Sequence, residues 1–142
     1  MSIWFSIHAN VKLRPDADAE KLAAALAAIE ELVPESTYPD PDRGSVTIET
    51  SHDMSHDTSE RLAAAVKDLA RTFGDGQAVE VETKYEDDDR LSFFVGPQAA
   101  VVAALQADAA GRSRAIAQRL AAELTKLAEQ PAGAFVETEG WW

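Results

Sequence analysis

The chain lacks cysteine altogether, carries few aromatic residues and has no long apolar run. Without cysteine it cannot form disulfides, thiolate metal sites or a cysteine nucleophile, and it suits a reducing compartment. No stretch approaches the ~18 apolar residues of a membrane span, and the start of the sequence lacks the basic and apolar regions of a signal peptide. We therefore expect a cytoplasmic protein that does not bind membranes.

Basic residues are also scarce, at 13 against 25 acidic residues, which gives a net charge of −12. The imbalance lies in residues 1–97, with 9 basic and 20 acidic side chains, whereas residues 98–130 are nearly neutral. A surface of this sign repels nucleic acid and favours a basic protein partner. The simpler alternative is that the acidic excess keeps an alanine-rich protein soluble.

The 142 residues and the 46% hydrophobic content are those of one soluble globular domain with its own core. Residues 3–13 alternate between apolar and polar side chains. Phe5 and Ile7 share one parity, whereas Trp4 and His8 fall on the other. This period of two predicts a strand with one buried and one solvated face. Further strands are predicted over residues 46–50, 78–86 and 91–95.

Two segments show helical spacing instead. Their apolar residues recur at i, i+4, i+7 and i+11, as Leu22, Leu26, Ile29 and Val33 and again as Leu62, Val66, Leu69 and Phe73. Asp16 or Asp18 is a suitable cap for the first helix. Asp57 with Glu60 is a plausible capping pair for the second helix, and Gly74 is placed to end it.

Strand–helix units in succession favour parallel strands joined by crossover helices. We therefore predict an α+β two-layer sandwich, with a four-stranded mixed sheet in the order βαβαββ and both helices on one face. The alternative, a ferredoxin-like sheet, needs a further strand near Tyr38, where turn-forming residues predict a loop, and a different use of residues 78–95. The uncovered face presents Trp4, His8, Glu49, Glu80, Glu82 and, depending on register, Phe94.

Residues 98–130 form a C-terminal arm beyond the sheet domain of residues 1–97. The arm contains no proline and one glycine, so we predict a long helix that is either continuous or broken near Gly111. An unbroken helix of this length would overhang its own domain or pack on another copy. Residues 131–142 form an aromatic tail.

The segment from Ser51 to Asp57 repeats Ser-His-Asp directly after the second predicted strand. His52, His56, Asp53 and Asp57 could bind a divalent ion if the loop brings them together. The histidines could also form a pH-responsive contact. The simpler interpretation is a polar loop leading into a helix, and no catalytic residue is assigned.

These patterns predict a non-enzymatic protein–protein interaction module without a cofactor that forms a homodimer. Its specific form would be an acidic inhibitor or immunity-type protein of bacterial or bacteriophage origin, with a basic protein as its partner. The alternative is a small metal-dependent enzyme or ligand-binding protein that uses the loop from His52 to Asp57. The predicted interface comprises Trp4, His8, Phe94, Arg112, Arg114, Arg119, Phe135, Trp141 and Trp142.

Overall fold

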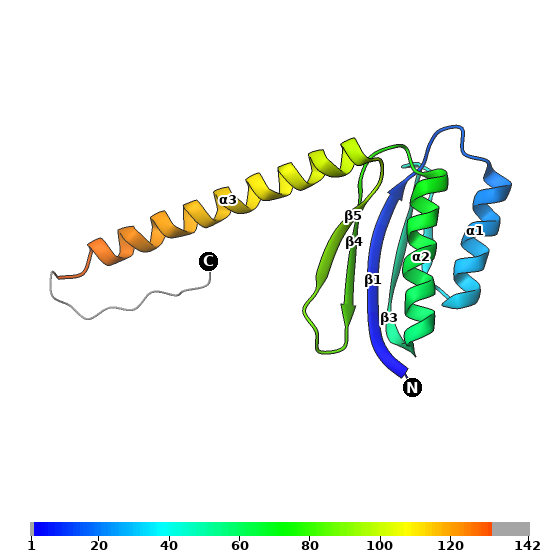
Figure 1. Cartoon of the computed structure of the whole chain (residues 1–142), viewed down its shortest axis with the longest axis horizontal. Helices are drawn as coiled ribbons and strands as arrows, with labels where there is room; N and C mark the ends of the chain where they lie inside the picture. The colour runs from blue at the N-terminus through cyan, green and yellow to red at the C-terminus, as the bar shows by residue number, and fades with distance from the viewer. Residues whose placement is uncertain (1, 132–142) are drawn as a thin grey trace. The chain divides into compact units, whose positions relative to one another are not determined.

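The computed structural model describes residues 2–131, which form five strands and three helices (Figure 1). In chain order these are β1 (Ser2–Lys12), α1 (Ala19–Leu32), β2 (Thr37–Asp40), β3 (Ser45–Ser55), α2 (His56–Phe73), β4 (Val79–Tyr85), β5 (Leu91–Val95) and α3 (Gln98–Ala128). Every element predicted from the sequence is present. The strand β2 is additional, because it lies in the segment where a loop was expected.

The five strands form one antiparallel sheet in the order β2-β3-β1-β4-β5. The α+β class is therefore confirmed, but the predicted four-stranded mixed sheet in the order βαβαββ is wrong. Because β2 turns back into β3, β3 runs antiparallel to β1 rather than parallel to it. The elements from β1 to β4 follow the ferredoxin-like βαββαβ order, and β5 extends the sheet as a hairpin.

The alternation in β1 sorts its side chains as predicted. Phe5, Ile7, Ala9 and Val11 are buried, whereas Trp4 and His8 are exposed. Together with apolar residues of β3, β4 and the helices, they form one core: Phe5, Ile7, Ala9, Val11, Ile29, Val33, Val46, Ile48, Met54, Leu62, Val66, Leu69, Phe73, Val79 and Val81. Every member lies between β1 and β4, so the core is complete before α3 begins.

The predicted stripe of α2 is fully buried, and that of α1 is buried at Ile29 and at Val33, its C-cap. Both helices therefore cover the same face of the sheet (Figure 1). Asp18 caps α1 by accepting hydrogen bonds from the backbone N–H groups of Glu20 and Lys21.

The predicted capping pair of α2, Asp57 with Glu60, is wrong because β3 continues to Ser55. The Ser55 hydroxyl is the N-cap and accepts a hydrogen bond from the Thr58 N–H at 3.1 Å. Gly74 ends α2 as predicted, but its φ of −67° is extended rather than left-handed. Glycine is needed there because a Cβ would lie 2.3 Å from the Ala70 carbonyl oxygen.

A single carboxylate holds the turn from α1 into β2. Glu30 accepts hydrogen bonds from the backbone N–H groups of Glu35 (2.6 Å) and Thr37 (3.0 Å) and from the Thr37 hydroxyl. The hydrogen bond from the Thr37 hydroxyl is the main cause that lowers the pKa of Glu30, and the bonds from the backbone add to it. The charged form of Glu30 therefore ties the end of α1 to Thr37, the first residue of β2.

α3 is continuous over 31 residues, about 46 Å at 1.5 Å per residue. Of the two alternatives for the arm, the structure has the unbroken helix, which runs through Gly111. The chain divides into two units, the first ending at Val102 and the second beginning at Ala103. The first unit thus includes the start of α3.

Among the helices of residues 2–131, none combines the length and the apolar character that crossing a membrane requires.

Candidate functional site

One face of the sheet carries neither α1 nor α2, and we call it the open sheet face. Its members, by strand register, are Trp4, Ser6, His8, Asn10, Thr47, Glu49, Ser51, Asp53, Glu80, Glu82, Lys84, Ser92 and Phe94. All are exposed or half-buried. Trp4, His8, Glu49, Glu80 and Glu82 lie where the alternation predicts, and the register adds Phe94 opposite Glu80.

A groove of about 700 Å³ crosses the open sheet face. Its floor includes Ser6, His8 and Ser51. One wall is formed by Glu35 and Tyr38 at the turn into β2, and Arg90 of the β4–β5 hairpin contributes on the side of β4. The volume falls within the range of ligand-binding clefts, but most of the lining residues are polar or charged, whereas small-molecule pockets are lined mainly by apolar side chains.

Trp4 is the largest side chain on this face, and it is held in place. Its indole Nε1–H donates to the Ser51 hydroxyl at 3.1 Å, and Ser51 in turn lies 2.7 Å from the Ser6 hydroxyl. The side chain nevertheless remains 45% exposed. A fixed, half-exposed indole loses little conformational entropy on binding, which is the property of an aromatic anchor at an interface.

Tyr38 provides a second aromatic surface at the wall of the groove. Its hydroxyl donates to the Glu35 carbonyl oxygen at 2.9 Å, and the residue is 52% exposed. Sequence reasoning assigned no role to Tyr38 because the residue falls among turn formers. Its place beside the groove depends on β2 pairing with β3.

A row of ionisable side chains crosses the centre of the face. His8 of β1 pairs in register with Glu49 of β3 on one side and with Glu82 of β4 on the other. Arg90 reaches Glu82 at 3.2 Å, and Glu80 accepts a hydrogen bond from Ser92. No described ion pair involves Glu49, so the row retains a carboxylate that can meet a cation of a partner.

The predicted metal-binding residues are divided between two elements. His52 and Asp53 lie in β3, whereas His56 and Asp57 form the first turn of α2. Successive residues of β3 alternate between the two faces of the sheet. Asp53, which pairs with Trp4, therefore belongs to the open sheet face, whereas His52, which pairs with Phe5, belongs to the opposite face. Asp57 is engaged by Arg61 at 3.0 Å.

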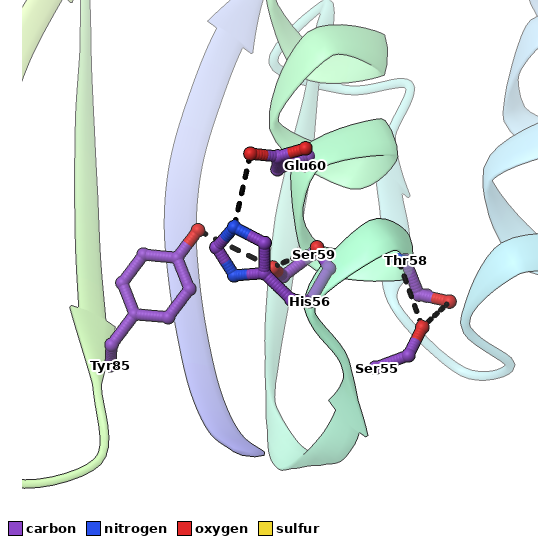
Figure 2. A network of polar contacts seen from close by, with 6 residues as sticks. All are labelled: Ser55, His56, Thr58, Ser59, Glu60 and Tyr85. Carbon is purple, nitrogen blue, oxygen red and sulfur yellow. Dashed lines mark hydrogen bonds and ion pairs between the residues drawn. The ribbon is translucent and has the colours of Figure 1, made fainter. Parts of the chain in front are cut away.

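His56 belongs to a local network on α2 (Figure 2). Its Nε2 lies 3.0 Å from a Glu60 carboxylate oxygen, and its ring packs 5.8 Å from that of Tyr85. The buried Ser59 hydroxyl donates to the His56 carbonyl oxygen at 2.7 Å and lies 3.3 Å from the Tyr85 hydroxyl. The network joins the start of α2 to the end of β4.

Residues 2–131 contain no group of three or more His, Cys, Asp or Glu side chains placed to hold a metal ion. The segments that follow β1 and β3 also lie at opposite ends of the sheet, because these two strands are antiparallel. Arg14 and Asp16, which follow β1, lie at the end of the sheet opposite to the histidine segment. Glu86, after β4, does reach the histidine end, where its N–H donates to the Trp4 carbonyl oxygen at 2.8 Å. The metal hypothesis stays a prediction.

The remaining interface residues lie outside the first unit. Arg112, Arg114 and Arg119 are on α3, where Arg112 pairs with Asp108 at 3.0 Å. Phe135, Trp141 and Trp142 lie outside the described residues. The first unit therefore contributes Trp4, His8 and Phe94 from the predicted interface.

Several residues of the groove were not predicted to lie on the open sheet face, among them Tyr38, Ser51, Lys84 and Arg90. Ser51 and Lys84 lie on the polar parity of their strands, a signal that was available in the sequence. Tyr38 and Arg90 are brought to the groove by the order of the strands in the sheet, and the local sequence does not indicate that order.

No protein-family model, curated protein or solved structure matches the chain.

Proposed function

We propose that this protein is a non-enzymatic protein–protein interaction module and that the open sheet face is its contact surface. The observation that carries the proposal is the half-exposed Trp4 on the face that α1 and α2 leave uncovered, where its indole is held by Ser51, a residue that lines the groove. Aromatic side chains with one polar handle are typical of the energetically important centre of an interface.

The charge of the face favours a basic partner. Glu49, Asp53, Glu80 and Glu82 outnumber Lys84 on the open sheet face, and the whole chain has a net charge of −12. Opposite charges on a partner would accelerate association and make it sensitive to salt. This is the behaviour of an acidic inhibitor that covers the functional surface of a basic protein.

The proposal is tested by capturing proteins from a bacterial lysate with the full chain at several salt concentrations. We expect the captured proteins to be enriched in basic isoelectric points and to be lost as salt rises. Glu49→Lys should reduce the capture of basic proteins by about tenfold or more, because it places a like charge at the centre of the face.

The matched control is Glu31→Lys, which makes the same charge change at an exposed position of α1. This variant should retain most of the capture, because α1 lies on the other face of the sheet. Captured proteins without a basic bias, or an equal loss in both variants, would refute the proposed contact surface.

We further propose that the protein is a homodimer, in which α3 supplies the contact between copies. The apolar side chains of Val102, Leu105, Ile116 and Leu124 are 39–66% exposed along this helix. Such residues on one long helix are costly to leave in water.

Light scattering of the full chain at micromolar concentration should give twice the mass of one chain, and the double variant Leu105→Glu with Leu124→Glu should give half of that mass. A monomeric wild-type chain would refute the dimer.

A further inference from the structure

A second cavity, of about 650 Å³, lies at the end of the sheet where β1, α2 and β5 finish. Three cations line it, namely Arg14 after β1 and Lys67 and Arg71 on α2, with Asp75 as the single acidic residue. The wall is therefore positive in a chain whose net charge is −12. This local reversal of sign requires an explanation beyond solubility.

The cations come together through the fold rather than through one helix. Lys67 and Arg71 are four residues apart on α2, where like charges face each other and repel. Arg14 is joined to the end of the same helix by its N–H, which donates to the Phe73 carbonyl oxygen at 2.9 Å. The negative end of the helix dipole accounts for a basic residue in the last turn, but not for Arg14.

The existing partners of these cations leave them able to bind an anion. Arg14 pairs with Asp16 at 3.6 Å and Arg71 with Asp68 at 3.4 Å; the Arg14 side chain is 44% exposed and the other three are largely exposed. Exposed ion pairs of this kind are weak and are readily exchanged. The Lys67 ammonium lies over the Phe93 ring, 5.3 Å from its centroid, so its charge is not neutralised by this contact.

Apart from Gln77 and three glycines, the rest of the lining is apolar. This apolar part comprises Ala70, Phe94, Val95, Pro97 and Val101. A Cβ at Gly96 would lie 3.1 Å from the Ala78 Cα, and Gly96 itself has a φ of +154° that favours glycine. Glycine at position 96, in the turn from β5 into α3, therefore suits both the close approach of this turn to the loop before β4 and its positive φ.

We propose that this cavity binds an amphipathic organic anion, with its carboxylate on Lys67, Arg71 and Arg14 and its hydrocarbon body against Val95, Pro97 and Val101. Guanidinium and ammonium groups recognise carboxylates through charge-assisted hydrogen bonds. The volume and the combination of apolar walls with a few charged groups match those of small-molecule sites. This cavity shares no lining residue with the groove of the open sheet face, although Phe94 belongs to both the cavity and that face.

The test is a titration of the full chain with octanoate, octylammonium and inorganic phosphate, followed by calorimetry and by the backbone amide signals of Gly76 and Gly96. We expect octanoate to bind and to shift both signals, phosphate to bind at least tenfold more weakly, and octylammonium not to bind. Equal binding of octylammonium, or phosphate binding as tight as that of octanoate, would overturn the proposal.

Variants assign the binding to this cavity. Lys67→Gln with Arg71→Gln should weaken octanoate binding by tenfold or more, and Arg14→Gln should weaken it to a smaller extent. All three positions are solvent-exposed, and thermal unfolding followed by circular dichroism checks that the variants fold. Arg61→Gln is the matched control, since Arg61 lies on the same helix but pairs with Asp57 outside the cavity. Undiminished binding in the double variant, or an equal loss in the control, would overturn the assignment.

Discussion

At the scale of single residues, Glu30 links local chemistry to the geometry of the groove. Its carboxylate accepts three hydrogen bonds from the turn that leads into β2, and β2 carries Tyr38 at the wall of the groove. A charged carboxylate with several donors has its ionised form stabilised, which explains the lowered pKa of Glu30. One half-buried side chain thus holds the turn that leads to an aromatic surface of the site.

We predict that Glu30→Gln destabilises the protein at pH 7 and that this difference shrinks in acid. The pKa of Glu30 in the folded chain lies below its ordinary value of 4.5, so the carboxylate contributes stability above pH 4.5. The contribution is lost as the pH falls through the lowered pKa, because the proton then binds in both states. Urea unfolding of the wild-type and variant chains at a series of pH values measures the difference.

Glu31→Gln is the matched control for this prediction, because it removes a neighbouring carboxylate and leaves the hydrogen bonds of Glu30 in place. Its effect on stability at pH 7 should be smaller than that of Glu30→Gln. A wild-type advantage over Glu30→Gln that stays constant between pH 7 and pH 3 would show that the charged form of Glu30 does not stabilise the fold.

The sequence predicted part of the site residue by residue, and the limit has a physical cause. Trp4, His8 and Glu49 were assigned to the uncovered face because a strand alternates its side chains between two faces. That rule needs only the local sequence. The contributions of Tyr38 and Arg90 to the groove depend on which strands are neighbours, and this is decided by long-range pairing.

At the scale of elements, β2 is the strand that changes the topology. It has four residues, one of which is Pro39, and it follows a turn with Glu35 at a positive φ of 60°. Proline is tolerated there because β2 is an edge strand and one side of its backbone needs no hydrogen bond from the sheet. Local propensity therefore predicts a loop, and only the pairing of residues 37–40 with Ser45–Ile48 makes a strand.

The two helices of the sandwich were predictable because their apolar residues recur at helical spacing, and this spacing marks the side of each helix that packs on the sheet. The second helix was misplaced only at its start. The alternation of β3 continues through the histidine segment to Ser55, so His52 belongs to a strand and His56 to a helix. The polar character of this segment predicts a loop, and pairing with the start of β1 overrides it.

The start of α2 gives a prediction at this scale. Ser55→Ala should lower the free energy of unfolding by about 1 kcal/mol, because it removes the hydroxyl that accepts the Thr58 N–H. Asp57→Asn should cost less, since it only weakens an exposed ion pair with Arg61. Urea unfolding at pH 7 compares the variants. A larger loss for Asp57→Asn would assign the cap to Asp57 instead.

At the scale of the whole molecule, the first unit contains a complete core. Every residue of that core lies between Phe5 and Val81, and the unit ends at Val102. The division between the two units therefore lies within α3, between Val102 and Ala103. A continuous helix can cross a boundary between units because all of its backbone hydrogen bonds are internal.

We predict that a chain truncated after Val102 folds without residues 103–142. Its thermal unfolding should remain cooperative, with a midpoint within about 5 °C of that of the full chain, since roughly 1 kcal/mol corresponds to such a shift in a domain of this size. Circular dichroism measures the transition. Loss of cooperative unfolding would show that the sheet domain needs its arm.

The acidic open sheet face is the central functional proposal, and footprinting of the full chain with a captured basic partner tests it most directly. Hydroxyl-radical labelling should oxidise Trp4 and Tyr38 readily in the free protein, because both are about half exposed. In the complex we predict that both are protected, whereas the exposed His56 at the start of α2 keeps its reactivity. If His56 became protected while Trp4 and Tyr38 stayed as reactive as in the free protein, the contact would lie elsewhere and the proposal would be contradicted.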